Sequence, residues 1–387
     1  MALHGKPIDA YRLFFPLGIV LGTFGVAIWP LYNYGILDGF SGRAHAFVQT
    51  NGFLYAFILG FLLTAIPRFT GTDAPSRPVQ YILATIVTVS ALSFELQVPL
   101  VGHTGFLAAH FMLISLAMRR FRRRRQDPPE TFVLIGIAFI SGALGGLINA
   151  GVAWNVVGPA WDLLGKRLLT EGMMLLLVLG VGGFLGPRLL GFAALPQFDG
   201  TAEFRARNRK PVYAAVGFTV LLSLVGEYGF GYAWMALVRA AAATASVLAT
   251  VRPWKRPAIR TTLAWCVWTA HWQVIAALWL VATFPRYRID FLHVLFIGGF
   301  TLLILAVGTR VTLSHGGHSL AVERGSWPLR VGLATGLTAM LARVGAPFSP
   351  NSYFDHLSWA GLLWLTGMLF WGSQLFRLIR LRPVPRT

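Results

Sequence analysis

The chain contains a series of apolar windows, each about as long as a membrane-spanning helix. A helix of ~20 apolar residues crosses the ~30 Å hydrocarbon core of a bilayer. Because lipid offers no hydrogen bonds to the backbone, windows of this length can cross only as helices. The sequence therefore predicts an all-α, polytopic transmembrane helix bundle with about twelve spans. The windows lie roughly at 12–33, 46–67, 79–99, 101–118, 131–150, 168–190, 211–229, 231–250, 259–284, 290–314, 329–346 and 355–376.

Composition supports this interpretation. Hydrophobic residues make up 56% of the 387 positions and charged residues only 12%, far from the averages of soluble domains. The longest connections, 191–210 and 315–328, are too short to form a separate soluble domain, so residues 1–387 are predicted to form a single integral membrane domain. The one cysteine, Cys266, excludes both a disulfide framework and a Cys-x-x-Cys-His motif for covalent haem.

Basic residues are distributed unequally between the two sets of predicted loops. An even number of spans puts both termini on one side, and the loops of that side hold 24 of the 33 basic residues. The positive-inside rule then predicts that both termini are cytoplasmic. Topology and contact with the lipid bilayer account for the net charge of +19, so no nucleic-acid partner is expected. The opposite loops hold Arg43, Lys166, Arg167, Arg286, Arg288 and Arg343, and the spans hold Arg188, Arg239 and Arg310.

The tenth window carries ionisable residues at both ends. His293 lies at its start, and Arg310 and His315 lie at its other end. Ionisable groups are costly in lipid, so they are candidates for a functional site. At ~1.5 Å per residue the two histidines lie ~33 Å apart, too far to share one haem or metal ion. The sequence therefore predicts two sites, one near each membrane surface.

Two histidines on different windows are predicted at similar depth near the outer surface. His45 begins the second window and His293 the tenth, and neutral imidazole is a common ligand of haem iron. Gly298 and Gly299 remove side chains where a flat macrocycle could approach the backbone. The alternative is that headgroups solvate both histidines and the glycines serve helix packing.

Other polar residues leave more than one interpretation open. His271, deep in the ninth window, is either a metal ligand, a hydrogen-bonding group or a packed side chain. Arg310 either pairs with a haem propionate or extends its stem to the headgroups. His103 and His110 lie ~10 Å apart along one helix, which is too far for one ion and favours simple packing.

Four stretches resemble the NnrS family. They are YRLFFPLG at 11–18, GRAHAF…GFLLTAIPRFTG at 42–71, TAHWQVIAALWL at 269–280, and LHVLFIGGFTLLILAVGTRVTLSHGG at 292–317. The resemblance covers nearly the whole chain in order. It implies a twelve-span protein of the bacterial cytoplasmic (inner) membrane that contains haem and copper. Members are associated with nitric oxide and with protection from nitrosative stress.

The resemblance also implies particular site residues. His45 matches the first histidine of the family motif Trp-His-Ala-His-Glu-Met, and His271 matches the histidine of the ninth span. His293, Arg310 and His315 match the last motif. All five are expected to bind a cofactor, with the four histidines as metal ligands. A weaker analogy, at the level of fold, is to haem-copper oxidases, whose haem is held by histidines on spans two and ten.

The chain departs from the family pattern at the first motif. The Trp, second His, Glu and Met of that motif are Ala44, Phe47, Val48 and Gln49 here. The Gly-Gly-Arg of span six reads Gly-Gly-Phe, with Arg188 nearby as a substitute. Because three candidate ligands are replaced in one motif, copper is expected to be weak or absent.

These observations lead to one leading hypothesis and one rival. The leading hypothesis is a membrane protein with one or two b-type haems that binds, detoxifies or reduces nitric oxide or a similar small gas. If it is an enzyme, it is a haem-dependent nitric oxide reductase, and its electron donor is open. The rival is a haem-free secondary transporter of a small solute. Its coupling groups would be Glu171, Glu227, Arg188 and Arg239.

Overall fold

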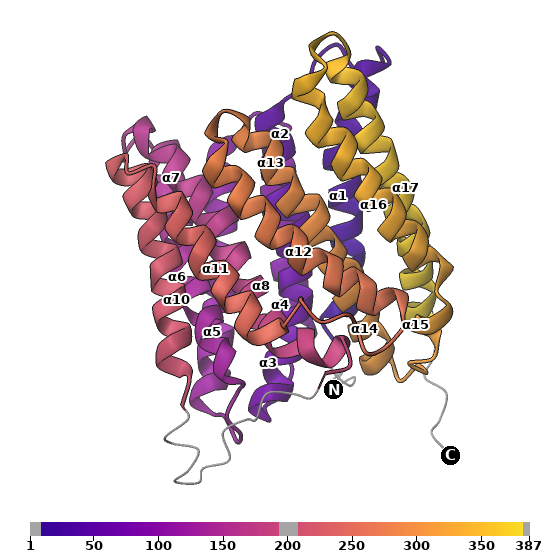
Figure 1. The fold of residues 1–387 in the computed structure, drawn as a ribbon. Coiled ribbons are helices and arrows are strands. Elements are labelled where there is room, and N and C mark those ends of the chain that lie inside the picture. The colour runs from indigo at the N-terminus through magenta and orange to yellow at the C-terminus, as the bar shows by residue number, and fades with distance from the viewer. Residues whose placement is uncertain (1–8, 193–207, 382–387) are drawn as a thin grey trace.

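Every predicted window forms a helix. The computed structural model describes residues 9–192 and 208–381 (Figure 1). Within these ranges the chain is built of α-helices with short π and 3-10 segments, and it contains no strand, which confirms the all-α fold. The extent of the single domain, 1–387, stays a prediction. Basic residues used above to orient the chain that lie outside the described ranges are Lys6, Arg205, Arg207, Arg382 and Arg386.

Ten helices in the described part of the chain are long and apolar enough to cross a membrane. Some are continuous α-helices, and others begin with a short helix that passes through a π segment into the main one. The main helices are α1 (Tyr11–Asn33), α3 (Tyr55–Thr70), α5 (Pro99–Arg122), α6 (Val133–Ala153), α8 (Leu175–Leu189), α10 (Lys210–Leu224), α12 (Thr262–Thr283), α14 (Leu302–Gly316), α16 (Trp327–Gly345) and α17 (Tyr353–Arg380). The short helices before a π segment are α2 (Gly42–Phe47), α7 (Asp162–Arg167) and α13 (Arg288–His293).

Two predicted windows form shorter helices. They are α4 (Arg77–Ser93) and α11 (Met235–Val251), of 17 residues each. At ~1.5 Å per residue each is ~26 Å long, slightly less than the hydrocarbon core. The turn before Pro99 ends α4 early, and Gly231, with φ of 77°, lies in the turn before α11. The count of twelve spans and the cytoplasmic position of the termini therefore stay predictions.

Four spans contain a π-helical segment. These segments are η1 (Val48–Leu54), η4 (Leu168–Met174), η5 (Val225–Gly229) and η7 (Val294–Thr301). A π turn holds one residue more than an α turn, and such insertions are frequent at functional sites. Each segment follows or contains an ionisable residue singled out by the sequence: His45 precedes η1, His293 precedes η7, and Glu171 and Glu227 lie in η4 and η5.

The helices pack together into one bundle. Figure 1 shows α16 and α17 beside α1 at one edge, and α5, α6 and α10 at the other. The beginning of α1 and the end of α17 lie side by side. Arg12 Nη1 in α1 donates a 2.6 Å hydrogen bond to the carbonyl of Ile379 in α17. We call this the lower end, and the end that carries α2, α7 and α13 the upper end, as drawn in Figure 1.

Candidate cofactor site

The structure brings His45 and His293 together at the upper end. His45 lies in α2 and His293 is the last residue of α13, and a π segment follows each helix. Figure 1 shows α2 and α13 at the same level of the bundle, and the two half-buried imidazoles lie within electrostatic range of each other. Two histidines from distant segments of the chain thus lie at the same end of the bundle.

Backbone carbonyls fix the tautomer of both histidines. Nδ1 of His45 donates to the carbonyl of Gly25 at 2.7 Å, and Nδ1 of His293 donates to that of Ile289 at 2.8 Å. The indole nitrogen of Trp29 lies 3.2 Å from the His45 Nδ1, but the shorter contact is to a carbonyl, which can only accept. With the proton on Nδ1, each Nε2 keeps its lone pair, which is the form that ligates metals.

A buried arginine accompanies this pair. Arg343 lies within electrostatic range of both His45 and His293, and its Nη1 donates a 2.7 Å hydrogen bond to Asp290 Oδ1. The Asp290 carboxylate balances the charge of the guanidinium, which is only 8% exposed. The sequence placed Arg343 in a loop and gave it no role.

Gly298 and Gly299 do not open a face for a macrocycle. A Cβ on Gly298 would lie 2.5 Å from Met340 Sδ, and one on Gly299 would lie 3.0 Å from Val274 Cγ2. Both glycines therefore allow η7 to pack closely against α12 and α16. The alternative interpretation, that the two glycines serve helix packing, therefore holds, because neighbouring helices already fill the space beside them.

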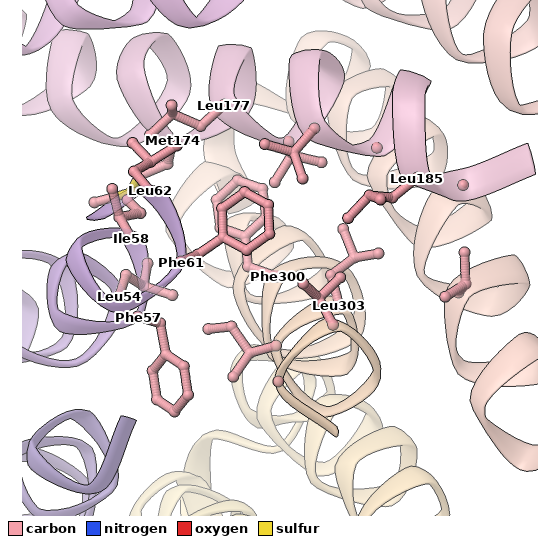
Figure 2. A pocket seen from close by; sticks show the side chains of 18 of the residues that line it. Leu54, Phe57, Ile58, Phe61, Leu62, Met174, Leu177, Leu185, Phe300 and Leu303 are labelled. Atoms are coloured by element: carbon pink, nitrogen blue, oxygen red, sulfur yellow. The ribbon is translucent and has the colours of Figure 1, made fainter. Parts of the chain in front are cut away.

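An apolar cavity of about 120 Å³ lies between α1, α3, α8, α12 and α14. Figure 2 shows that the side chains around it come from several helices, with Phe61 and Phe300 among them. Three π segments each contribute one lining residue, namely Leu54 of η1, Met174 of η4 and Phe300 of η7. The irregular segments thus help to shape the cavity.

His271 is the one residue with a polar side chain among those that line this cavity. Its Nδ1 donates a 2.7 Å hydrogen bond to the carbonyl of Val267, and its buried Nε2 has no partner in the described part of the chain. A Cβ on Gly182 would lie 2.8 Å from that Nε2, so the glycine lets α8 pack closely against the His271 ring. An unpartnered imidazole nitrogen beside apolar walls is the kind of donor that an axial ligand of haem iron provides.

The lower end holds Arg310 and His315, which the structure separates from the other predicted residues. Arg310 donates two hydrogen bonds, of 3.0 and 2.6 Å, to the carboxylate of Glu323 in α15 (Val322–Gly325). This carboxylate is a protein partner that the sequence did not suggest, and a role of Arg310 in cofactor binding stays a prediction. His315 Nδ1 and Tyr11 Oη are buried without partners in residues 9–192 and 208–381, and their rings lie 6.2 Å apart.

Two other histidines are packed side chains. The ring nitrogens of His110 contact Tyr55 Oη at 3.2 Å and a carbonyl of α6 at 3.0 Å, so both are satisfied. His103 lies edge-on to the rings of Phe47 and Phe94. Among the residues that the structure describes, no group of three or more His, Cys, Asp or Glu could hold a metal ion. The expectation that copper is weak or absent stays a prediction, which metal analysis can test.

The four residues proposed as coupling groups of a transporter do not all contact one another. Glu171, Glu227 and Arg239 form a buried ion cluster together with Arg288, which the sequence had assigned to a loop. Arg188 lies apart from them and donates to the carbonyl of Phe184 four residues earlier, with its guanidinium over that ring. The transporter function stays an untested alternative.

Ten apolar helices and a buried histidine facing an apolar cavity define a helical, membrane-embedded protein with a candidate cofactor site. The chain belongs to the NnrS family, because the model of the NnrS protein family matches residues 9–382. This match confirms the resemblance noted in the sequence. No curated protein matches the chain.

Proposed function

We propose that the chain is a haem-binding protein of the cytoplasmic membrane that handles nitric oxide or a similar small gas. The observation that carries the proposal is the unpartnered Nε2 of His271 on the wall of an apolar cavity. In a membrane interior an unsatisfied polar atom is costly, so its retention is best explained by a ligand. Haem, when bound, supplies an iron atom that nitric oxide can bind.

His271 would provide the axial nitrogen. The hydrogen bond from Nδ1 to Val267 orients the ring and keeps the lone pair on Nε2. Gly182 lets α8 approach that nitrogen without a side chain, and the apolar walls exclude water from it. Nitric oxide is small and dissolves in lipid, so it can reach such a site from the bilayer.

His45 and His293 would provide a second site at the upper end. In each, the bond from Nδ1 keeps the lone pair on Nε2, and Arg343, which is paired with Asp290, lies within electrostatic range of both imidazoles. His315 and Arg310 stay candidates for a site at the lower end. We infer one or two haems on this basis, and the electron donor for any reduction is not identified.

Absorption spectroscopy of the purified protein tests the proposal. We expect a Soret band that is lost or shifted in His271→Ala, and a partial change in His293→Ala. His318→Ala is a matched control, because its Nε2 only donates to a carbonyl of α17. A colourless wild-type preparation from haem-replete cells would refute haem binding.

Two further measurements refine the function. Nitric oxide consumption under reducing conditions identifies a reductase, whereas a full spectral shift without consumption identifies a binding protein. Metal analysis should find iron and little copper, because Phe47, Val48 and Gln49 replace candidate copper ligands. Copper at one equivalent per chain would contradict that expectation.

A further inference from the structure

The buried ion cluster at the upper end contains a closed network of two arginines and two glutamates. Arg239 Nη2 contacts Glu171 at 3.1 Å and Glu227 at 2.7 Å. Arg288 contacts the same two carboxylates, at 2.9 and 2.7 Å. Each cation thus bridges both anions, and the charges of these four residues cancel. Glu171 is completely buried and Arg239 is 1% exposed, so the network lies well inside the protein.

A fifth residue, Arg167, gives the cluster one positive charge in excess. Arg167, at the end of α7, has a single contact with the network, 3.5 Å from its Nη1 to Glu171 Oε1. Because Glu171 already contacts both bridging arginines, no carboxylate of the cluster is left to balance Arg167. Its side chain is only 14% exposed, so water screens the excess charge poorly.

The unsatisfied polar atoms of this cluster are three guanidinium N–H groups and one hydroxyl, and each of them can donate a hydrogen bond. They are buried and find no acceptor in residues 9–192 and 208–381. In a hydrocarbon setting each such group costs free energy, and an acceptor that reaches them removes that cost. The four atoms are Arg167 Nε, Arg239 Nε, Arg288 Nε and Tyr228 Oη.

Tyr228 places its aromatic ring beside the excess charge. It lies in η5, next to Glu227, and its ring centroid is 5.9 Å from the Arg167 guanidinium carbon and 5.0 Å from that of Arg288. The π segment therefore presents both a carboxylate of the network and a neighbouring hydroxyl donor. One excess positive charge beside unsatisfied N–H and O–H donors, with no carboxylate left to balance it, is complementary to a single small anion.

We propose that Arg167 and Tyr228 bind a small monovalent inorganic anion against this cluster. Water could accept the hydrogen bonds but would leave the charge in place, whereas one anion satisfies both. Arg167 and Arg288 keep 14% and 13% of their side chains exposed, so a small ion can reach the cluster at the upper end. The site is independent of haem and of the proposed function.

Thermal unfolding of the purified full-length protein tests the site. Sodium gluconate is replaced stepwise by sodium chloride or, separately, by sodium nitrite at constant ionic strength. We expect at least one of the two anions to raise Tm saturably, on the order of 5 °C at saturation, because an anion that binds only the folded state stabilises it. Equilibrium dialysis with that anion should give one ion per chain.

Variants separate a bound anion from a general salt effect. Arg167→Gln removes the excess charge and Tyr228→Phe removes only the hydroxyl, so both should lose most of the Tm response. Arg286→Gln and Tyr232→Phe are matched controls on exposed residues of the same end and should keep it. Arg167→Lys, which retains the charge, should restore a weaker response.

Three outcomes would overturn the proposal. One is a wild-type Tm that responds to neither anion. The second is an unchanged response in both Arg167→Gln and Tyr228→Phe. The third is dialysis that detects no bound ion. Tyr228→Phe changes neither ring size nor charge, so it keeps the test decisive even if Arg167→Gln fails to fold.

Discussion

At the scale of single residues, hydrogen bonding distinguishes histidines that the sequence leaves alike. Both nitrogens of His110 have partners, whereas Nε2 of His271 has none among the described residues. Both residues are buried, so depth alone cannot separate them. The difference arises from neighbours on other helices, a hydroxyl in one case and a glycine in the other. The sequence contains these neighbours but does not show that they meet.

Gly182→Ala tests whether haem binding by His271 needs the close approach of α8 that the glycine allows. The added Cβ would lie 2.8 Å from Nε2, so either the imidazole or α8 must shift. We expect a lower haem-to-protein ratio and a destabilisation of about 1–3 kcal/mol, as is typical of overpacking. The neighbouring Gly183→Ala is the control, since its Cβ would lie 3.3 Å from Thr131 and Thr250, away from His271. Equal haem content in both variants would contradict the role of Gly182.

The pair of Arg310 and Glu323 gives a second prediction at this scale. Glu323→Gln leaves the guanidinium without its counter-charge, which we expect to cost about 2 kcal/mol, because one partner is a quarter exposed. The double variant Arg310→Leu/Glu323→Leu should recover most of that loss, since apolar residues can replace a buried ion pair. Denaturant unfolding measures both variants. A Glu323→Gln variant as stable as the wild type would show that the pair contributes nothing.

At the scale of elements, the sequence predicts the helices well and their irregularities poorly. Each apolar window became a helix, because length and hydrophobicity decide that outcome locally. The four π segments were not predicted, since one extra residue per turn leaves no distinct composition. Arg288 was assigned to a loop although it begins α13 and completes the ion cluster. Such partnerships depend on how helices pack, which an apolar window does not reveal.

Deleting Thr50 tests what the π segment η1 does. A π turn holds one residue more than an α turn, so the deletion should turn η1 into a regular α-helix without rotating α2 as a whole. The wide turn after α2 would be lost, and with it the local placement of His45, so we expect spectral features that depend on both His45 and His293 to weaken while those of His271 persist. Thr50→Ala, which keeps the residue count, is the control. Identical spectra from the deletion and the control would show that η1 does not position a ligand.

At the scale of the whole molecule, the ends of the chain and the histidines define a direction through the membrane. The beginning of α1 and the end of α17 meet at the lower end, and the pair of His45 and His293 lies at the upper end. The positive-inside rule applied to the sequence puts the lower end in the cytoplasm. A gas or an anion from outside the cell would then meet the upper end first.

Cysteine labelling tests this direction, because the chain has only one cysteine, Cys266, and it is buried. Gly39 lies in an exposed loop at the upper end, and Gly325 is the exposed last residue of α15 at the lower end; an added Cβ would meet nothing within 4 Å at either position. With a membrane-impermeant maleimide on spheroplasts, Gly39→Cys should be labelled at once. Gly325→Cys should be labelled only after permeabilisation, and the unsubstituted chain should stay unlabelled. The reverse pattern would mean that both ends of the chain face outward, which would place the His45–His293 pair and the ion cluster at the cytoplasmic surface.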